Sequence, residues 1–154
     1  MRVVLQRVDG ARVEVDGEVV GEIGDGLLAL VGVARGDGPE EAARLARKTL
    51  ALRLFPVGDR PFEVSVADAG GGVLVVSQFT LLGDARRGNR PSWAAAAPPA
   101  EAAPLVDAYA AALAAGGVPV ARGRFGAHMR VGLVNDGPVT LVLDAGGGPA
   151  TGAG

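Results

Sequence analysis

Cysteine is absent from this sequence and histidine nearly so, and these shortages exclude several kinds of chemistry. Without cysteine, the 154 residues can form no disulfide framework, no thiolate nucleophile and no Cys-ligated zinc site. The single histidine, His128, leaves a Ser-His-Asp triad possible only through that residue. A lone histidine between Ala and Met more often has a structural role. An enzyme made from this chain would therefore rely on backbone N–H groups, hydroxyls or groups of its substrate.

Strong net charge and long apolar runs are also missing. The formal net charge is −2, so nucleic-acid binding would depend on a local basic patch. No apolar run approaches the ~20 residues that span a bilayer, and the charges near the N-terminus are too close together for a secretory signal peptide. We therefore expect a cytoplasmic protein without membrane association. Length and composition indicate one globular domain over residues 1–145, followed by a Gly/Ala-rich flexible tail at 146–154.

The apolar patterning predicts a mixed α/β chain with hairpins towards both ends and two helices between them. Asp16-Gly17 is a strong hairpin signal. Helices are predicted at 39–54 and about 100–115, the second only if Pro104 lies in its first turn. Strands are predicted at 3–5, 12–16, 18–23, 27–33, 73–81, 118–122, 130–134 and 139–143. Residues 56–72 look like a loop with one possible short strand at 62–66, and 135–138 like a turn between strands.

The segment 73–81 is the most informative one, because an apolar run leads directly into Ser77, Gln78 and Thr80. Burying such polar groups without partners costs ~1–3 kcal/mol. They either bond across the sheet or face a ligand, and the sequence leaves both interpretations open. In the second, backbone N–H groups at the strand end would bind a developing oxyanion. Thr80 would then position a group rather than attack it, because no base is adjacent.

A basic loop follows this strand. It carries Arg86, Arg87 and Arg90, and its position favours phosphate contact, although most such loops are simply solvated. Phe79 and Trp93 flank it, and both are expected in the core. Further along, 136–138 has the composition of an ordinary turn, in which the glycine would permit close approach to a ligand.

Several motifs resemble the D-aminoacyl-tRNA deacylase family, and they occur in the order expected for it. The resemblance covers the chain from Met1 to about Asp144. Two motifs are signatures of that family, Ser-Gln-Phe-Thr at 77–80 and Gly-Pro-Val-Thr at 137–140. The others are the N-terminal Met-Arg-Val-Val-Leu-Gln-Arg-Val, Arg-Pro-Ser at 90–92 and Phe-Gly-Ala-x-Met at 125–129.

The resemblance implies a fold and a reaction. The fold would be a mixed α/β single domain in β/β/α layers, with a curled, barrel-like β layer and two main helices on one face. The reaction would be hydrolysis of the ester bond of D-aminoacyl-tRNA, with glycyl-tRNA also accepted. The resemblance further implies a homodimer and assistance from the 2′-hydroxyl of the terminal adenosine. It implies no cofactor and no metal.

The resemblance also implies a set of site residues. A Gly137-Pro138 bond in cis would enter the pocket of the partner subunit, hold the α-amino group and exclude L side chains. Arg7 would help to fix that turn, and Arg86, Arg87 and Arg90 would contact the tRNA weakly. The pocket floor would consist of Ser77, Gln78, Phe79 and Thr80, and Phe125 and Met129 would complete the substrate site.

The sequence departs from the family pattern at three positions. His128 stands where an acidic residue is common, Asn89 where a basic residue is expected, and Trp93 where Phe is usual. None lies in a signature motif. An alternative hypothesis is a non-catalytic RNA-binding or structural dimer on the same scaffold, because no general base is identifiable.

Overall fold

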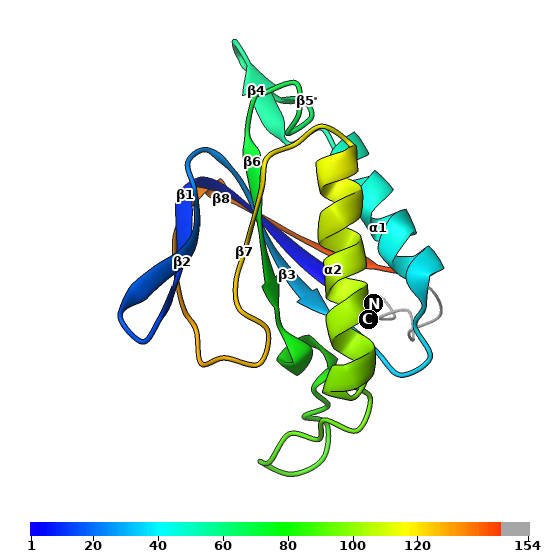
Figure 1. The fold of residues 1–154 in the computed structure, drawn as a ribbon. Helices are drawn as coiled ribbons and strands as arrows, with labels where there is room; N and C mark the ends of the chain where they lie inside the picture. The colour runs from blue at the N-terminus through cyan, green and yellow to red at the C-terminus, as the bar shows by residue number, and fades with distance from the viewer. Residues whose placement is uncertain (146–154) are drawn as a thin grey trace.

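One mixed sheet of six strands dominates the computed structural model, which describes residues 1–145 (Figure 1). Its strand order is β2-β1-β3-β6-β7, and β8 pairs with β1 off this path. The expected tail at 146–154 lies outside the described residues. The strands are β1 (Arg2–Val15), β2 (Glu18–Ile23), β3 (Gly26–Gly32), β6 (Gly72–Ser77), β7 (Val120–Arg122) and β8 (Arg130–Asp144).

The long strand β1 organises this sheet. It pairs antiparallel with β2, β3 and β8, whereas β3, β6 and β7 run parallel to one another. The predicted hairpin between β1 and β2 is confirmed, because Asp16 and Gly17 both have positive φ (51° and 81°). At the other edge β2 approaches β7 so closely that a Cβ on Gly21 would lie 2.3 Å from the carbonyl oxygen of Arg122. The sheet therefore curls into a nearly closed barrel.

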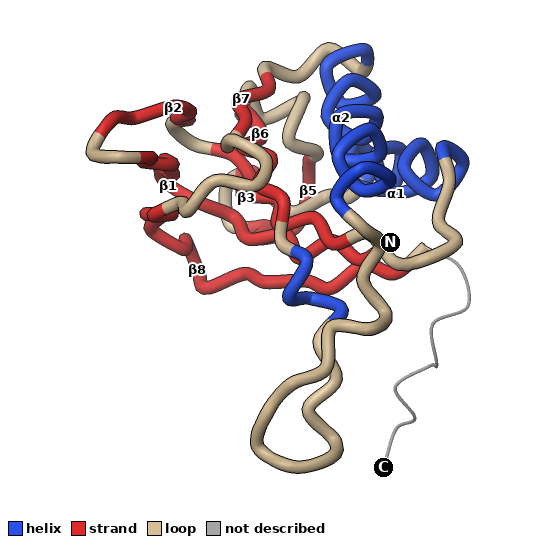
Figure 2. Tube along the Cα trace, turned by 60° about the horizontal axis from the view of Figure 1, so that its bottom comes forward, coloured by secondary structure: helices blue, strands red, loops and turns tan. Residues whose placement is uncertain are grey.

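Two helices, α1 (Pro39–Ala51) and α2 (Pro99–Ala115), lie side by side on one face of the sheet (Figure 2). The predicted stripe of α1 is buried at Ala42, Leu45, Ala46 and Thr49, as are Leu105, Tyr109 and Leu113 of α2. Thr49 Oγ1 donates to the carbonyl of Leu45 (2.9 Å) and lies 2.9 Å from the Tyr109 hydroxyl. The mixed α/β fold with two helices on one face is therefore confirmed.

Two hydrophobic cores follow from this arrangement. The larger core lies between the helices and the sheet, and includes Val3, Leu5, Val73 and Val75. The smaller one fills the inside of the curl with Val13, Leu74 and neighbours from β3 and β6. Alternate residues of β6 thus serve different cores, as expected for a strand covered on both faces. In the described part of the chain no helix is long and apolar enough to span a membrane.

The predicted strand 73–81 is wrong at its C-terminal end. β6 stops at Ser77, and a short 3₁₀ helix, η1 (Phe79–Leu82), follows. The neighbouring strand β3 sets this limit, since Val31 is its last residue in register with β6. The Gln78 N–H still donates to the Val31 carbonyl (2.7 Å), and the chain then turns back through Leu81 N–H to Gln78 O (3.2 Å).

Other boundaries also differ from the prediction, and the strands predicted at 3–5 and 12–16 form one strand, β1. Residues 56–72 were expected as a loop with one possible short strand at 62–66, whereas β4 (Phe55–Val57) and β5 (Arg60–Val64) form a small hairpin that turns at Gly58 with φ +56°. The strands predicted at 130–134 and 139–143 are one strand, β8, because both halves pair with β1 across a shift in register. Helix α1 ends at Ala51, and Pro104 lies inside α2 beyond its first turn.

Candidate active site

A cavity of about 480 Å³ opens where the parallel strands β3 and β6 end. The start of α2 and the 123–129 link form its other walls. Ligands of open sheets with parallel strands bind beyond the carboxyl ends of those strands, so the cavity lies where the topology favours a ligand. Of the expected site residues, five line it: Ser77, Gln78, Phe79, Phe125 and Met129.

The floor of the cavity is the end of β6 and the start of η1. Thr80 does not line the cavity, but its hydroxyl accepts a hydrogen bond from the side-chain amide of Gln78. The N–H groups of Phe79 and Thr80 precede the first hydrogen bond of η1. They donate to no other backbone group within residues 1–145. The N–H of Phe79, which lines the cavity, and the N–H of Thr80, the next residue in the chain, are therefore two backbone donors of the type that stabilises an oxyanion.

The 123–129 link forms a wall of the cavity. The Arg124 N–H lies 3.4 Å from the Met129 sulfur, and a Cβ on Gly123 would lie 2.7 Å from that sulfur, so glycine lets Met129 fold against the link. His128, for which the sequence favoured a structural role, also lines the cavity and is exposed.

Most residues that sequence reasoning missed in this cavity are apolar. The end of β3 could have been anticipated, because its apolar run at 27–33 was a predicted strand beside 73–81 and neighbouring strand ends share a site. The lining residues of α2 carried no such signal, since only the docking of the helix places them. The lining residues missed are Val31, Val33, Val76, Ala97, Pro99, Ala102, Val106, Gly126, Ala127 and Val131.

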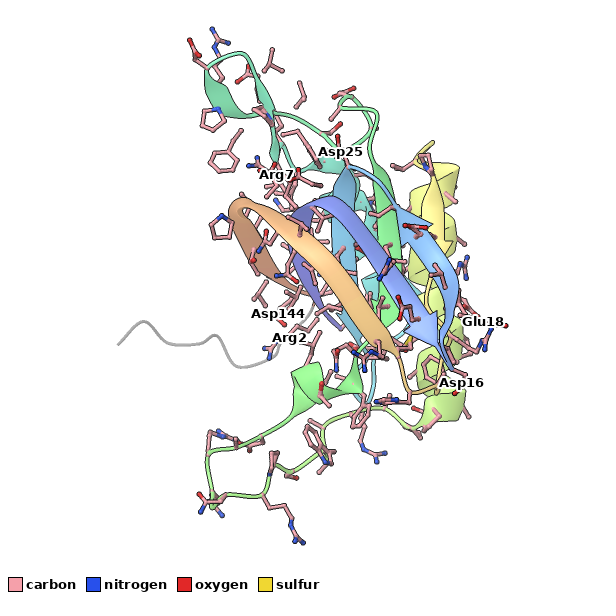
Figure 3. All side chains as sticks on the ribbon, turned by 90° about the vertical axis from the view of Figure 1, so that its left-hand side faces the viewer. Arg2, Arg7, Asp16, Glu18, Asp25 and Asp144 are labelled. Atoms are coloured by element: carbon pink, nitrogen blue, oxygen red, sulfur yellow. The ribbon has the colours of Figure 1, made fainter. Side chains whose placement is uncertain are left out.

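Gly137, Pro138 and Arg7 lie away from this cavity, at the opposite end of the sheet. Arg7 is in register with Leu27 at the start of β3, whereas the cavity begins at Val31. The four residue steps from Leu27 to Val31 span ~13 Å at ~3.3 Å per residue. Figure 3 shows Arg7 beside the bend of β8, at the far end of the molecule from η1. The turn therefore does not contribute to the cavity of its own chain.

The turn itself is held firmly. The Gly137-Pro138 peptide bond is cis, and Gly137 has φ +128°. Arg7 Nε donates to the Asp136 carbonyl (3.2 Å) and pairs with the Asp136 carboxylate (3.1 Å). Asn135 Oδ1 accepts the Val139 N–H (3.1 Å). The turn is thus presented at an exposed tip of the sheet with its geometry fixed.

The basic loop projects from the body of the molecule below η1 (Figure 2). Paired backbone hydrogen bonds of 2.8 Å between Asp84 and Ser92 close its base. Arg86 binds the Asp84 carboxylate (2.8 and 2.6 Å), and this guanidinium lowers the pKa of Asp84 to about 2. Arg87 and Arg90 have no ion pair within the described residues. The free positive charge of the loop therefore comes from Arg87 and Arg90.

An apolar strip lies on the face of the sheet away from the helices, between the turn and η1. Val142 of β8 is 59% exposed, and it is in register with half-buried Val4 of β1, which in turn faces Leu30 of β3. Polar residues border the strip, with Gln6 and Thr140 on one side and the Arg2–Asp144 ion pair (2.8 Å) on the other. An uncovered apolar strip with a polar border is typical of a protein–protein contact.

The curled mixed sheet and its two helices define a fold class that solved structures share. A probable eukaryotic D-amino acid tRNA deacylase matches with a TM-score of 0.78 over 92% of this chain and 97% of that chain. Its sequence identity is 18%, so this match concerns the fold alone. A c-Myc DNA Unwinding Element Binding Protein matches with a TM-score of 0.90 at 36% identity, over 96% of this chain and 100% of that chain.

Sequence comparisons are more specific. The D-Tyr-tRNA(Tyr) deacylase family model matches residues 4–144, and the chain belongs to this family. A D-aminoacyl-tRNA deacylase of Beutenbergia cavernae is 60% identical over 146 residues, 94% of this chain and 100% of that protein. The protein of the same name from Chloroflexus aurantiacus is 58% identical over 145 residues, 94% of this chain and 91% of that protein.

Proposed function

We propose that this chain hydrolyses the ester bond of D-aminoacyl-tRNA. Water attacks the ester carbonyl, the bond to the ribose oxygen of the terminal adenosine breaks, and free D-amino acid and tRNA are released. The observation that carries the proposal is the cavity floored by 77–79 in a chain 58–60% identical to curated D-aminoacyl-tRNA deacylases.

The cavity floor supports a mechanism based on main chain. The N–H groups of Phe79 and Thr80 would stabilise the oxyanion that forms on the ester carbonyl. Removing one donor of this kind typically costs ~3 kcal/mol of transition-state stabilisation. The 2′-hydroxyl of the substrate would assist the attacking water, so the proposal requires no protein nucleophile, no metal and no cofactor.

A second copy of the chain is part of the proposal. The turn at 135–138 lies ~13 Å along the sheet from its own cavity, so it would act in the cavity of a partner. The apolar strip of Leu30, Val4 and Val142 supplies a surface on which two copies could pair, since an isologous interface uses the same patch twice. The homodimer would then bring each turn to the other subunit's floor.

Selection by chirality follows from this arrangement. The carbonyls of Gly137 and Pro138 would hold the α-amino group and leave no room for a side chain in the L direction. Such a clash occurs next to the Cα atom of the substrate, so it excludes an L-amino acid whatever its side chain is. It also predicts that glycyl-tRNA is accepted, because glycine has no side chain to exclude. As aminoacyl-tRNA serves translation, we place the protein in the cytoplasm.

The direct test compares D-Tyr-tRNA and L-Tyr-tRNA as substrates of the purified chain. We expect release of D-tyrosine and retention of the L-ester, measured as the fraction of tRNA that stays charged over time. Equal rates on both esters, or no release of D-tyrosine, would refute the proposal.

The role of Thr80 separates two mechanisms for the same reaction. We expect Thr80→Ala to keep substantial activity, because within residues 1–145 its hydroxyl hydrogen-bonds only to Gln78, and because the backbone would carry the chemistry. Single-turnover deacylation of D-Tyr-tRNA is the measurement. Complete loss of activity in a variant with an unchanged circular dichroism spectrum would instead favour a nucleophilic Thr80.

A non-catalytic nucleic-acid-binding dimer is the second candidate. Its support is the lack of an obvious general base at the cavity, where His128 is the one titratable side chain of the described lining. The same assay decides between them. Binding of tRNA without any change in the rate of D-ester hydrolysis would favour this candidate.

A further inference from the structure

Two aromatic side chains beside the cavity are exposed, although both were expected in the core. Phe79 is 55% exposed and Trp93 is 43% exposed. Their rings meet edge to face, with centroids 5.4 Å apart and planes at 76°. Phe79 lines the cavity, so Trp93 lies one side chain away from it. Large exposed aromatic surface at the edge of a cavity is the kind of surface on which nucleic-acid bases stack.

Trp93 has a fixed position. A Cβ on Gly83 would lie 2.6 Å from Trp93 Cζ3, so the six-membered ring packs directly on this glycine. The Trp93 carbonyl accepts the Ala96 N–H (3.0 Å), and the Ala94 carbonyl accepts Arg35 Nε (2.9 Å). The indole is therefore held in place on one side while much of it remains open to solvent.

Positive charge lies beside the same aromatic pair. The Asp84–Ser92 backbone pairing places the start and end of the basic loop next to Gly83 and Trp93. Arg87 and Arg90 on that loop are exposed and form no ion pair within residues 1–145. A stacking surface next to unpaired arginines combines the two elements that bind single-stranded nucleic acid, base stacking and phosphate attraction.

We propose that Trp93, with Arg87 and Arg90, binds the unpaired nucleotides that precede the terminal adenosine of the tRNA. The inference rests on the proposed function, which brings the esterified 3′ end into the cavity. A base next to that end would stack on the open indole surface, and the backbone beyond it would pass along the loop. RNA is the occupant that fits, because one patch offers both an aromatic surface and cationic groups.

Binding is tested first by the fluorescence of Trp93, which is the only tryptophan in the chain. Uncharged tRNA should quench this emission. A tRNA that keeps the terminal adenosine but carries abasic nucleotides at the two preceding positions should bind with little quenching. Equal quenching by the two tRNAs, or none by either at saturating concentrations, would overturn the proposal. This test does not depend on hydrolysis.

Kinetics provide the second test. Base stacking is worth ~1–3 kcal/mol by alanine substitution, so Trp93→Ala should raise KM for D-Tyr-tRNA about 5-fold to 150-fold with kcat little changed. Trp93→Phe, which retains an aromatic ring, should recover most of the affinity. For D-tyrosyl-adenosine, which lacks the preceding nucleotides, Trp93→Ala should behave as wild type. An equal loss on both substrates would show that Trp93 merely supports Phe79 and would overturn the proposal.

The two loop arginines, Arg87 and Arg90, allow a third test that is independent of Trp93. Replacing Arg87 and Arg90 together by alanine should flatten the dependence of log KM on log salt concentration, because fewer counterions are released on binding. Arg47→Ala, on the exposed side of α1, is the matched control and should leave the slope unchanged. An unchanged slope in the double variant contradicts the role of the loop. If wild type fails to hydrolyse D-Tyr-tRNA but the fluorescence test succeeds, only the proposed function fails.

Discussion

Arg7 shows how much one buried charged residue can organise. It is 8% exposed, and its guanidinium contacts residues from three separate parts of the chain. Nη1 donates to the Leu54 carbonyl (2.7 Å), Nε donates to the Asp136 carbonyl (3.2 Å), and the ring of Phe62 lies 6.0 Å from Cζ. Because guanidinium nitrogens have a fixed planar spacing, the residue sets the distance between the turn and the β4–β5 hairpin.

We predict that Arg7→Lys lowers stability by ~1–3 kcal/mol, because one ammonium cannot reach both carbonyls and leaves a buried acceptor unpaired. Urea denaturation followed by circular dichroism measures this. Arg2→Lys, on the same strand, is the control. Its ion pair with Asp144 is partly exposed and should contribute no more than ~1 kcal/mol. Equal losses in the two variants would contradict the prediction.

At the residue scale, the sequence predicts residue types at the site better than their exposure. Ser77, Gln78 and Phe79 line the cavity, as the motif suggested. Phe79 and Trp93 were expected in the core because large aromatics bury much apolar area. Their exposure depends on the turn of η1 and on the bare backbone of Gly83, neither of which has a local sequence signal.

At the scale of elements, the two helices are joined by one buried polar contact. The Tyr109 hydroxyl of α2 lies 2.9 Å from Thr49 Oγ1 of α1, its one side-chain hydrogen-bond partner among residues 1–145. Burial raises the pKa of Tyr109, because the charged phenolate would be poorly solvated there. The buried position therefore favours the neutral phenol of Tyr109. The packing of α1 against α2 is accordingly expected to depend on whether Tyr109 is protonated.

The sign of the pH dependence follows from this pKa. A tyrosine in the unfolded chain loses its proton near pH ~10, whereas folded Tyr109 keeps it. Its stabilising contribution is therefore complete below pH ~10 and is lost as pH rises further. Tyr109 is the only tyrosine, so tyrosinate absorbance should appear together with loss of helical circular dichroism in alkaline titration.

Tyr109→Phe is the control for this titration. It removes the ionisable group while Thr49 keeps its bond to the Leu45 carbonyl, so near neutral pH it should cost only ~1 kcal/mol. Above pH ~10 its stability should depend less on pH than that of wild type. Titration of the phenol in a fully folded chain near pH ~10 would contradict the prediction.

Elements with local signals were predicted well, and those fixed by partners were not. The 3.6-residue periodicity of α1 and α2 located both helices, since the apolar stripe is a property of each segment alone. The end of β6 at Ser77 depends on where β3 ends its pairing. The fusion of two predicted strands into β8 depends on β1 being long enough to pair with both halves. Such limits are set by residues far away in sequence.

At the scale of the whole molecule, the cavity and the turn occupy opposite ends of one sheet. This separation was not predictable from motif order, because it requires the full strand register. Within one chain the two signature motifs therefore cannot form one site. Under the proposed function, the site is a property of two chains, and variants in the two motifs should complement each other.

We predict that Gly137→Val and Phe79→Glu are each inactive, and that refolding a mixture of the two restores activity. In a heterodimer one site combines an intact floor with an intact turn, while the other carries both changes. Random pairing makes half of the dimers heterodimers, so recovery should reach about a quarter of wild-type activity. Deacylation of D-Tyr-tRNA is the readout. The separately refolded variants are the controls, and no recovery in verified heterodimers would argue against a shared site.

The pairing of β1 with β8 also has a consequence for synthesis on the ribosome. Arg2 is in register with Asp144, so a loop of nearly the whole described chain must close before that edge of the sheet forms. Closing such a loop costs ~4 kcal/mol of chain entropy. The pairing of β1 with β8 can form only after β8 has left the exit tunnel of the ribosome. The turn at 135–138 is thus among the last parts to take shape. Under the proposed function, incomplete chains with a formed cavity would lack the turn that excludes L side chains, and we expect hydrolysis to begin only once full-length subunits meet.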